Sequence, residues 1–224
     1  RIVTTITRKD QEAAYAALRK GVLDYDRRHG YRGPEAFIEL PQDGVSDERL
    51  DEALSDVSDH DDLLAALVLQ ASPKAVTVYR RGKEITISRN GLRFAAPMLA
   101  EKAPQTRRIR RGAIVRIRDA GDKTWEIVQL PEVQAALVSI DPKDGAVRAL
   151  VGGFDFARTK FNHATQGQRQ PGSSFKPFIY SAALERGYGP GHVVADDPLY
   201  FPAGVTGSQA WEPKNYDGKF GGPM

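Results

Sequence analysis

The chain has 224 residues, of which 41% are hydrophobic and 27% are charged, so it is long enough for one large domain or two ordinary ones. No apolar run approaches the roughly 18 residues of a membrane-spanning helix, and the lack of cysteine excludes disulfides and thiolate catalysis. The net charge of +3 is small beside 32 basic and 29 acidic residues, so local clusters of charge matter more than the total.

The N-terminal stretch RIVTTITRKD lacks the apolar core and cleavage site of a signal peptide, so we expect any targeting segment to lie outside this chain. Its first six residues alternate in polarity and predict a strand. After Asp10 the apolar residues recur at helical spacing and predict a helix to about Arg28, while the turn-rich HGYRGPEAF marks a boundary near Gly33. The residues that recur at this spacing are Ala14, Leu18, Val22 and Tyr25.

The middle of the chain is rich in short alternating runs. Residues 46–70 are acidic except for the apolar 63–69, and we expect a solvated helical stretch or a loop there. AVTVYR and KEITISR, separated by Arg81 and Gly82, predict a β-hairpin, and AIVRIRD and TWEIVQL, separated by AGDK, predict another. Together these runs predict a small β-barrel or sandwich in residues 31–130.

The last third begins at Pro131. VQAALVSID, the turn PKDG and AVRALVGG predict a buried hairpin, and a polar, glycine-bearing loop follows it. From Ser173 the run SSFKPFIYSAALERG predicts a helix that ends near Gly187. The remaining residues are rich in Gly, Pro and Asp and predict surface loop.

Basic residues gather in and around TRRIRR, where they could meet phosphates or another polyanion. We favour a solvated rim of the β domain, because charge runs are usually solvated faces. The histidines show no metal-ligand spacing, so we expect no metal site, and nothing in the sequence calls for a cofactor. The basic cluster is Thr106 to Arg111 with Arg80, Arg81, Arg116 and Arg118, and the histidines are His29, His60, His163 and His192.

Ser173 and Lys176 form a Ser-x-x-Lys pattern at the start of the predicted helix, where their side chains share nearly one face. A serine is a competent nucleophile only if a base takes its proton, and a lysine does so only if desolvation or a neighbouring cation lowers its pKa. The aromatic and apolar residues Phe175, Phe178 and Ile179 would help to desolvate the lysine. The sequence therefore predicts a nucleophile and its base.

Two alternatives compete with this interpretation. Ser-x-x-Lys recurs by chance about once in a couple of hundred residues, so helix capping by Ser173 is the simpler reading of the pattern alone. Ser174 is the neighbouring candidate nucleophile, but the residue three positions beyond it is Pro177, which has no basic group. We therefore favour Ser173.

Three ordered stretches, ALVSIDPKDGAVRALVGGFDF, FNHATQGQRQPGSSFKPFIYSAALERG and WEPKNYDGKFGGP, resemble the transpeptidase domain of class A penicillin-binding proteins, the bifunctional peptidoglycan synthases. RIVTTITRKDQEAAYAAL is similar to the start of that domain, and one branch of the family carries an inserted β domain of oligonucleotide/oligosaccharide-binding (OB) type. The resemblance implies an α+β fold: a partial penicillin-binding-protein/β-lactamase-like transpeptidase domain interrupted by a small OB-like barrel. Its expected parts are residues 1–30 and 131–224 for the transpeptidase and 31–130 for the insert.

The resemblance implies that Ser173 is acylated by D-Ala-D-Ala stem peptides and by β-lactams, with Lys176 as its proton acceptor, although which group is the acylation base is disputed in such families. Trp211, Asn215 and Tyr216 match an element at the active-site rim, where packing of a loop is an equal alternative to ligand contact. The family also implies a periplasmic location with a membrane anchor outside this chain, a glycosyltransferase in the parent protein, and an outer-membrane lipoprotein activator that docks on the insert. Nucleic acid is not a favoured partner.

The family's Ser-x-Asn and Lys-Thr-Gly motifs do not follow Ser173 in this sequence, so we expect these 224 residues to be inactive alone. Ser88, Arg89 and Asn90 spell Ser-x-Asn, but they precede the nucleophile inside the insert, which favours chance. Two other functions stay open: a partner-docking β module whose flanking segments are catalytically incomplete, and a stand-alone serine hydrolase that shares only Ser-x-x-Lys.

Overall fold

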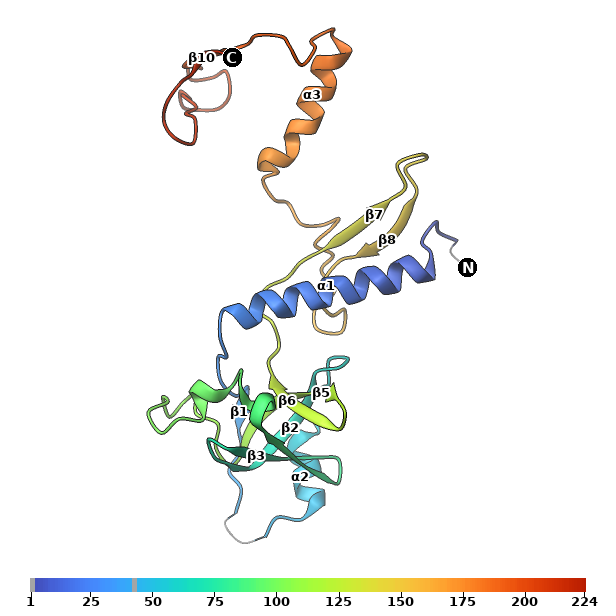
Figure 1. Ribbon diagram of the computed structural model, residues 1–224, viewed down its shortest axis with the longest axis vertical. Helices are drawn as coiled ribbons and strands as arrows, with labels where there is room; N and C mark the ends of the chain where they lie inside the picture. Colours follow the sequence, from blue (N-terminus) through green and yellow to red (C-terminus); the bar gives the residue numbers. More distant parts are fainter. Residues whose placement is uncertain (1–2, 42–43) are drawn as a thin grey trace. The chain divides into compact units, whose positions relative to one another are not determined.

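The computed structural model describes residues 3–41 and 44–224, and the chain forms two compact units, Arg1–Gly167 and Gln168–Met224. The first unit contains a long helix, a small barrel and a hairpin, and the second contains a helix and mostly irregular chain (Figure 1). The elements, in chain order, are α1 (Arg8–Arg28), β1 (Ala36–Phe37), α2 (Asp47–Leu54), β2 (Leu64–Ala71), β3 (Ala75–Arg80), β4 (Lys83–Ser88), η1 (Arg89–Leu92), η2 (Ala96–Met98), β5 (Ala113–Gly121), β6 (Thr124–Val128), β7 (Leu137–Ile140), β8 (Val147–Val151), η3 (Gly172–Phe175), α3 (Lys176–Glu185), β9 (Ala195–Asp196) and β10 (Gly222–Pro223).

Helix α1 is confirmed at the predicted place, and its start has a clear physical cause. Thr7 has an extended backbone, and its Oγ1 accepts a hydrogen bond from the Asp10 amide at 3.2 Å, which satisfies one of the amides left open at a helix N-terminus. The predicted apolar positions Ala14, Leu18 and Val22 are buried, where they pack with residues of β8, whereas Tyr25 is 45% exposed. Tyr25 therefore shares the helical spacing but not the burial of the other three.

The predicted N-terminal strand is absent from Val3–Thr7, and residues 1–2 lie outside the described residues. This segment runs beside the start of β8 instead. Thr5 Oγ1 donates to the Val147 carbonyl at 2.7 Å, and the Thr7 amide donates to the Arg148 carbonyl at 3.1 Å. The chain turns into α1 at once, so it forms no ladder with β8.

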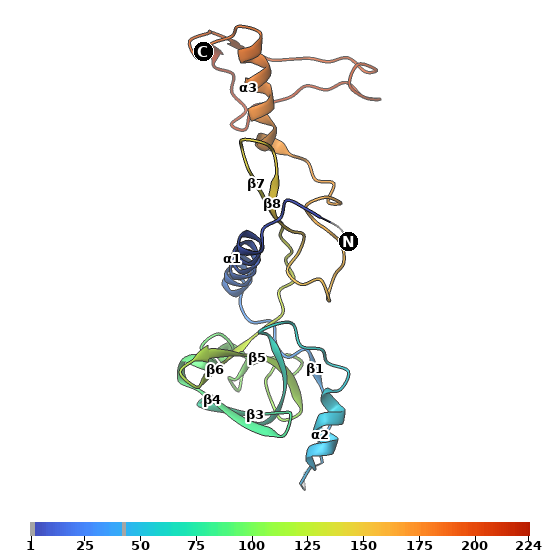
Figure 2. The same cartoon turned by 90° about the vertical axis from the view of Figure 1, so that its right-hand side faces the viewer.

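The predicted β domain is a barrel-like sheet with the strand order β1-β5-β2-β3-β4, to which β6 adds by pairing with β5 (Figure 2). All of these pairs are antiparallel, and β2–β3, β3–β4 and β5–β6 are joined as hairpins. The sheet curls until β4 lies beside β6, which encloses one apolar core. Strands β2, β3 and β5 supply most of its centre, including Val68, Val78 and Val115.

Strand β2 corrects the expectation of a loop or solvated helix in residues 46–70. Only α2 is helical there, and Leu64–Ala71 is a central strand of the barrel. Ala66 and Val68 point into the barrel core, whereas Leu67 packs on the other face with Leu50 of α2. Because both faces are covered, the strand has no polar alternation, and its sequence does not distinguish a strand from a buried helix.

Both predicted hairpins of the barrel are confirmed, and their turns explain their register. Arg81 and Gly82 have φ of 46° and 72°, the left-handed pair that a two-residue hairpin loop requires, and Arg80 pairs with Lys83 across it. In the second hairpin Asp122 and Lys123 take the same role with φ of 50° and 58°. The AGDK turn is therefore tighter than expected.

The hairpin β7–β8 is confirmed as a hairpin, but its burial is one-sided. In β8, Ala149 and Val151 are at most 5% exposed and pack against α1, whereas Val138 and Ile140 of β7 are 45% and 57% exposed. The expectation of a buried hairpin was therefore right for β8 and wrong for β7. No helix within the described residues is long and apolar enough to cross a bilayer.

Candidate active site

Ser173 lies in the turn that introduces α3, and the local sequence explains its presentation. Gly172 has φ of +54°, a left-handed conformation that glycine adopts without strain, and the 3₁₀ turn η3 begins there. Pro177 falls in the first turn of α3, where its missing amide leaves no helix bond broken. The helix predicted from Ser173 thus begins as a 3₁₀ turn, becomes α-helical at Lys176, and ends before Gly187, whose φ is +87°.

The Ser173 hydroxyl does not cap this helix. Pro171 and Phe175 hold the N-cap positions of η3 and α3, and neither position has a side-chain cap hydrogen bond. The Lys176 amide donates to the Ser173 carbonyl, so the two residues sit at the two ends of one closed turn. Capping is therefore not the role of Ser173 in this structure, and both side chains are exposed.

The expected desolvation of Lys176 is not present. Phe175 and Phe178 lie with ring centroids 5.5 Å apart, but they are 53% and 66% exposed, and Ile179 is 55% exposed. Leu184 and Tyr180 of α3 are likewise 59% and 62% exposed, so the apolar side chains of this helix are largely uncovered. The expectation that these residues bury the lysine was wrong for this chain, and Ser173 Oγ and Lys176 Nζ form no hydrogen bond here.

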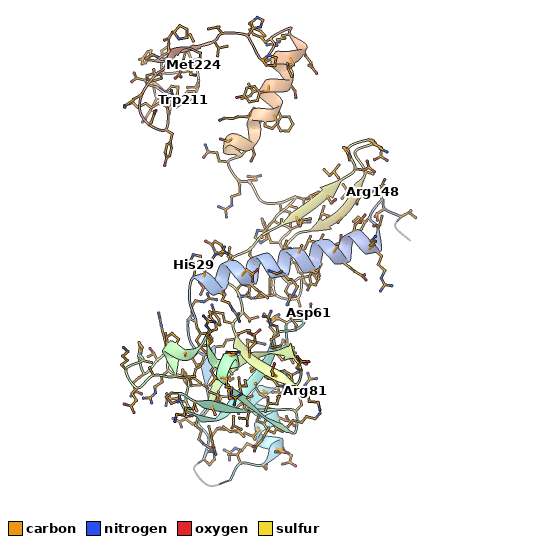
Figure 3. The ribbon with its side chains drawn as sticks, in the orientation of Figure 1. His29, Asp61, Arg81, Arg148, Trp211 and Met224 are labelled. Carbon is orange, nitrogen blue, oxygen red and sulfur yellow. The ribbon has the colours of Figure 1, made fainter. Side chains whose placement is uncertain are left out.

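Trp211, Asn215 and Tyr216 lie in the irregular chain after α3, and each is held differently. Trp211, labelled in Figure 3, forms an isolated β-bridge with Phe201. The two rings stack with centroids 5.3 Å apart. Tyr216 is fully exposed. Among the described residues, no hydrogen bond joins any of the three to Ser173 or Lys176, so the structure does not assemble the five predicted residues into one site.

Asn215 is a structural tie in this loop. Its Nδ2 donates to both carboxylate oxygens of Asp196, at 2.9 and 2.8 Å, and to the Lys219 carbonyl at 2.9 Å. The Gly221 amide donates to the same carboxylate at 2.8 Å. The hydrogen bonds from Asn215 and Gly221 hold the pKa of Asp196 below its ordinary value.

The basic cluster predicted as a solvated rim divides into two groups. Arg80, Arg116 and Arg118 pair with Asp59, Glu35 and Glu126 at 2.6–2.7 Å, and the Arg116 side chain is only 3% exposed. Arg80 and Arg116 are largely buried, which corrects the rim interpretation for them, whereas Arg118 is 28% exposed and Arg81 is 77% exposed. The arginines of TRRIRR do lie on its surface, half-buried in the case of Arg108.

The polar contacts where α1 and the loop after β8 meet the barrel were not predicted from the sequence. The Arg19 side chain is 7% exposed, bonds Asp62 at 2.5 Å and lies over the Phe154 ring at 4.2 Å. Its neighbour Asp61, labelled in Figure 3, sits in the turn that faces α1. The one available signal was a charged residue next to the apolar stripe of α1. No three metal-ligating side chains gather anywhere in the described ranges.

Comparisons with known proteins agree with this architecture. The family model described as "Penicillin-binding protein OB-like domain" matches residues 31–133, and "Penicillin binding protein transpeptidase domain" matches residues 135–221. Penicillin-binding protein 1A of Neisseria lactamica is 43% identical over 224 residues, and that of Escherichia coli K12 is 40% identical over 232 residues. These alignments cover 99% and 100% of this chain but only 28% and 27% of the relatives.

A solved structure supports the same assignment. The crystal structure of penicillin-binding protein 1A from Haemophilus influenzae matches 99% of this chain with a TM-score of 0.77 and 33% identity. The match covers 32% of that protein. The chain therefore spans less than a third of the length of these relatives, and it carries the mixed α and β architecture expected from its sequence.

Proposed function

Because the chain belongs to the penicillin-binding proteins, we propose that it is part of a peptidoglycan D,D-transpeptidase in which Ser173 is the acylated nucleophile and Lys176 accepts its proton. The observation that carries this proposal is the turn at Ser173. Ser173 is exposed, its hydroxyl does not cap the helix, and it follows Gly172, whose backbone is left-handed. The Ser173 carbonyl accepts a hydrogen bond from the Lys176 amide. Ser173 and Lys176 both fall within the residues matched by the family model of the transpeptidase domain.

The reaction follows from these groups. Ser173 Oγ attacks the carbonyl carbon of the penultimate D-alanine, and its proton passes to Lys176 Nζ. The terminal D-alanine leaves as an amine that takes a proton, and an ester remains on Ser173. An amine of a neighbouring stem peptide then attacks the ester, which forms the cross-link and frees the serine. A β-lactam acylates the same oxygen, but its ester is released slowly.

Ser173 and Lys176 are both exposed in this chain. We propose that the rest of the transpeptidase domain covers α3 in the parent protein and supplies the Ser-x-Asn and Lys-Thr-Gly groups. Residues 1–30 and 131–224 would then belong to that domain, with residues 31–130 inserted. The 224 residues alone would be acylated slowly or not at all.

The further features of the parent protein are inferences from family membership. They are a glycosyltransferase domain, a membrane anchor outside this chain, a periplasmic location and an outer-membrane lipoprotein activator. Trp211, Asn215 and Tyr216 are proposed to line the rim of the substrate site.

The test is intact-mass spectrometry after incubation with a fluorescent penicillin, on this chain and on the longer parent protein. The neighbouring serine gives a matched control: Ser173→Ala should abolish the adduct on the parent, and Ser174→Ala should keep it. Lys176→Ala should slow acylation by about 10²-fold or more. An adduct that survives Ser173→Ala, or that Ser174→Ala removes equally, would overturn the assignment.

A second candidate function rests on a separate observation. The barrel has its own apolar core, and its own family model matches residues 31–133, so it is built as a distinct module. We propose that this module docks a partner. Binding of a partner to the barrel should persist in the Ser173→Ala variant. This outcome distinguishes the docking proposal from the catalytic proposal.

A further inference from the structure

One stretch of the barrel accounts for the chain's net excess of positive charge. Residues 93–111, which link η1 to β5, contain six basic residues and one acidic residue, a net charge of +5. The other 205 residues contain 26 basic and 28 acidic residues, a net charge of −2. The basic residues of this stretch, here called the cationic segment, are Arg93, Lys102, Arg107, Arg108, Arg110 and Arg111.

The cationic segment is ordered, because its apolar residues are anchored in the barrel core. Ala95, Leu99 and Ile109 are at most 3% exposed. The Ile109 amide donates to the Met98 carbonyl at 2.8 Å, and the amides of Arg107 and Arg108 both donate to the Pro104 carbonyl at 2.9 Å. The basic side chains therefore project from an ordered backbone. Binding of a ligand would cost little backbone entropy, because the segment is already ordered.

The charges of the segment are available. None of its six basic side chains lies within ion-pair distance of a carboxylate in residues 3–41 and 44–224, unlike the paired Arg80, Arg116 and Arg118. Arg110 is exposed, and its guanidinium lies over the Phe37 ring at 4.7 Å. Arg111 differs, because it donates to the carbonyls of Leu69 and Pro41.

The chemistry of the segment fits an anion with carboxylate or phosphate groups. Five of the six basic residues are arginines, whose planar fork binds a carboxylate or phosphate through two parallel hydrogen bonds. No large apolar side chain of the segment is highly exposed, so it lacks the anchors with which a protein inserts into a lipid surface. Six cations within one 19-residue segment fit a polymer with repeated anionic groups.

We propose that the cationic segment binds a peptidoglycan strand through the carboxylates of its stem peptides, and so tethers the polymer to the barrel. This inference rests on the proposed function, which makes peptidoglycan the polymer on which the parent protein acts. Arg107, Arg108 and Arg110 are the principal contacts. The site is separate from Ser173 and takes part in no bond making.

The experiment is co-sedimentation of the 224-residue chain with purified peptidoglycan sacculi. The test variant combines Arg107→Gln, Arg108→Gln and Arg110→Gln, and the control combines Arg28→Gln, Arg49→Gln and Lys74→Gln, three exposed residues with the same total loss of charge. We expect the test variant to bind about tenfold more weakly or worse, the control to bind like the unmodified chain, and binding to fall between about 50 and 200 mM salt. Circular dichroism spectra of all three proteins should coincide.

Two further arms identify the anion. Sacculi whose carboxylates have been converted to neutral amides should no longer retain the chain, and vesicles of phosphatidylglycerol should bind it more weakly than sacculi do. Equal binding by test and control variants, no effect of amidation, or tighter binding to the vesicles would each overturn the proposal. Penicillin labelling of the parent protein should be unchanged in the test variant, so failure of the acyl-enzyme assignment and failure of this inference are distinguishable.

Discussion

His60 Nδ1 and Asp155 Oδ2 lie 2.6 Å apart, in a contact between the turn that precedes β2 of the barrel and the loop that follows β8. Both side chains are only 12% exposed. Burial raises the pKa of Asp155, but the hydrogen bonds from His60 and from the backbone amides of Ala157 and Arg158 outweigh it, so the pKa lies below its ordinary value. The contact therefore ties the barrel to the chain that leads toward Ser173.

Replacing this carboxylate should weaken the first unit. Asp155→Asn should lower the free energy of unfolding by about 1–3 kcal/mol near pH 7, because a buried charged hydrogen bond is lost. A depressed pKa contributes stability above the unfolded value, near pH 4, and that stability is lost as the pH falls through the folded pKa. Urea unfolding followed by circular dichroism should thus show a difference at pH 7 that shrinks by pH 3, while the exposed control Asp56→Asn shows none at either pH.

The second prediction concerns Arg19, which is buried on α1 against the barrel turn. Arg19→Met keeps the apolar stem but removes the guanidinium that pairs with Asp61 and Asp62. Those carboxylates are about half exposed and can be rehydrated, so we expect a loss of about 1–3 kcal/mol, below the full cost of an unpaired buried charge. Arg8→Met on the same helix breaks only an exposed pair with Glu12 and should cost less than about 0.5 kcal/mol. Equal thermal midpoints for the two variants would contradict this account.

Local chemistry was the part of the fold that the sequence predicted well. Arg81-Gly82 between two alternating runs determined a hairpin, because the turn and the strand periodicity agree. The run SSFKPFIYSAALERG likewise located the start of a helix, which begins as η3 and continues as α3. In both cases the deciding interactions lie within a few residues of each other.

The parts that sequence could not predict depend on distant residues. Strand β2 is covered on both faces, so its apolar run carried no period from which to choose a strand. His60 and Asp155 are 95 positions apart, and the local sequence around either residue does not predict their contact. The exposure of Phe178 was also hidden, because burial depends on what packs against α3 and not on α3 itself.

The third prediction contrasts two glycines of the first unit. Gly112 has φ of +83°, and a Cβ placed on it would lie 2.0 Å from the Ile38 carbonyl oxygen, so Gly112→Ala should destabilise the barrel by about 2 kcal/mol or more. Gly21 is inside α1 with nothing within 4 Å of an added Cβ. Gly21→Ala should therefore stabilise the chain by about 0.5–1 kcal/mol through helix propensity. Thermal unfolding of both variants checks the two opposite signs.

The last prediction concerns the loop that Asn215 ties to Asp196. Asn215→Ala removes the three hydrogen bonds of the side-chain amide, so amide exchange of Asp196 and Gly221 should speed up, and the pKa of Asp196 should rise toward its ordinary value. The neighbouring Tyr216 is fully exposed, and Tyr216→Ala is the matched control that should leave both quantities unchanged. Because the Asp196 pKa is depressed, the loop of the unmodified chain should also loosen as the pH falls through that pKa, and Asn215→Ala should remove most of this pH dependence. If Tyr216→Ala loosened the loop as much as Asn215→Ala does, the hydrogen bonds of the Asn215 amide would not be what holds the loop together. Ligand contact would then be the better explanation of the role of Asn215.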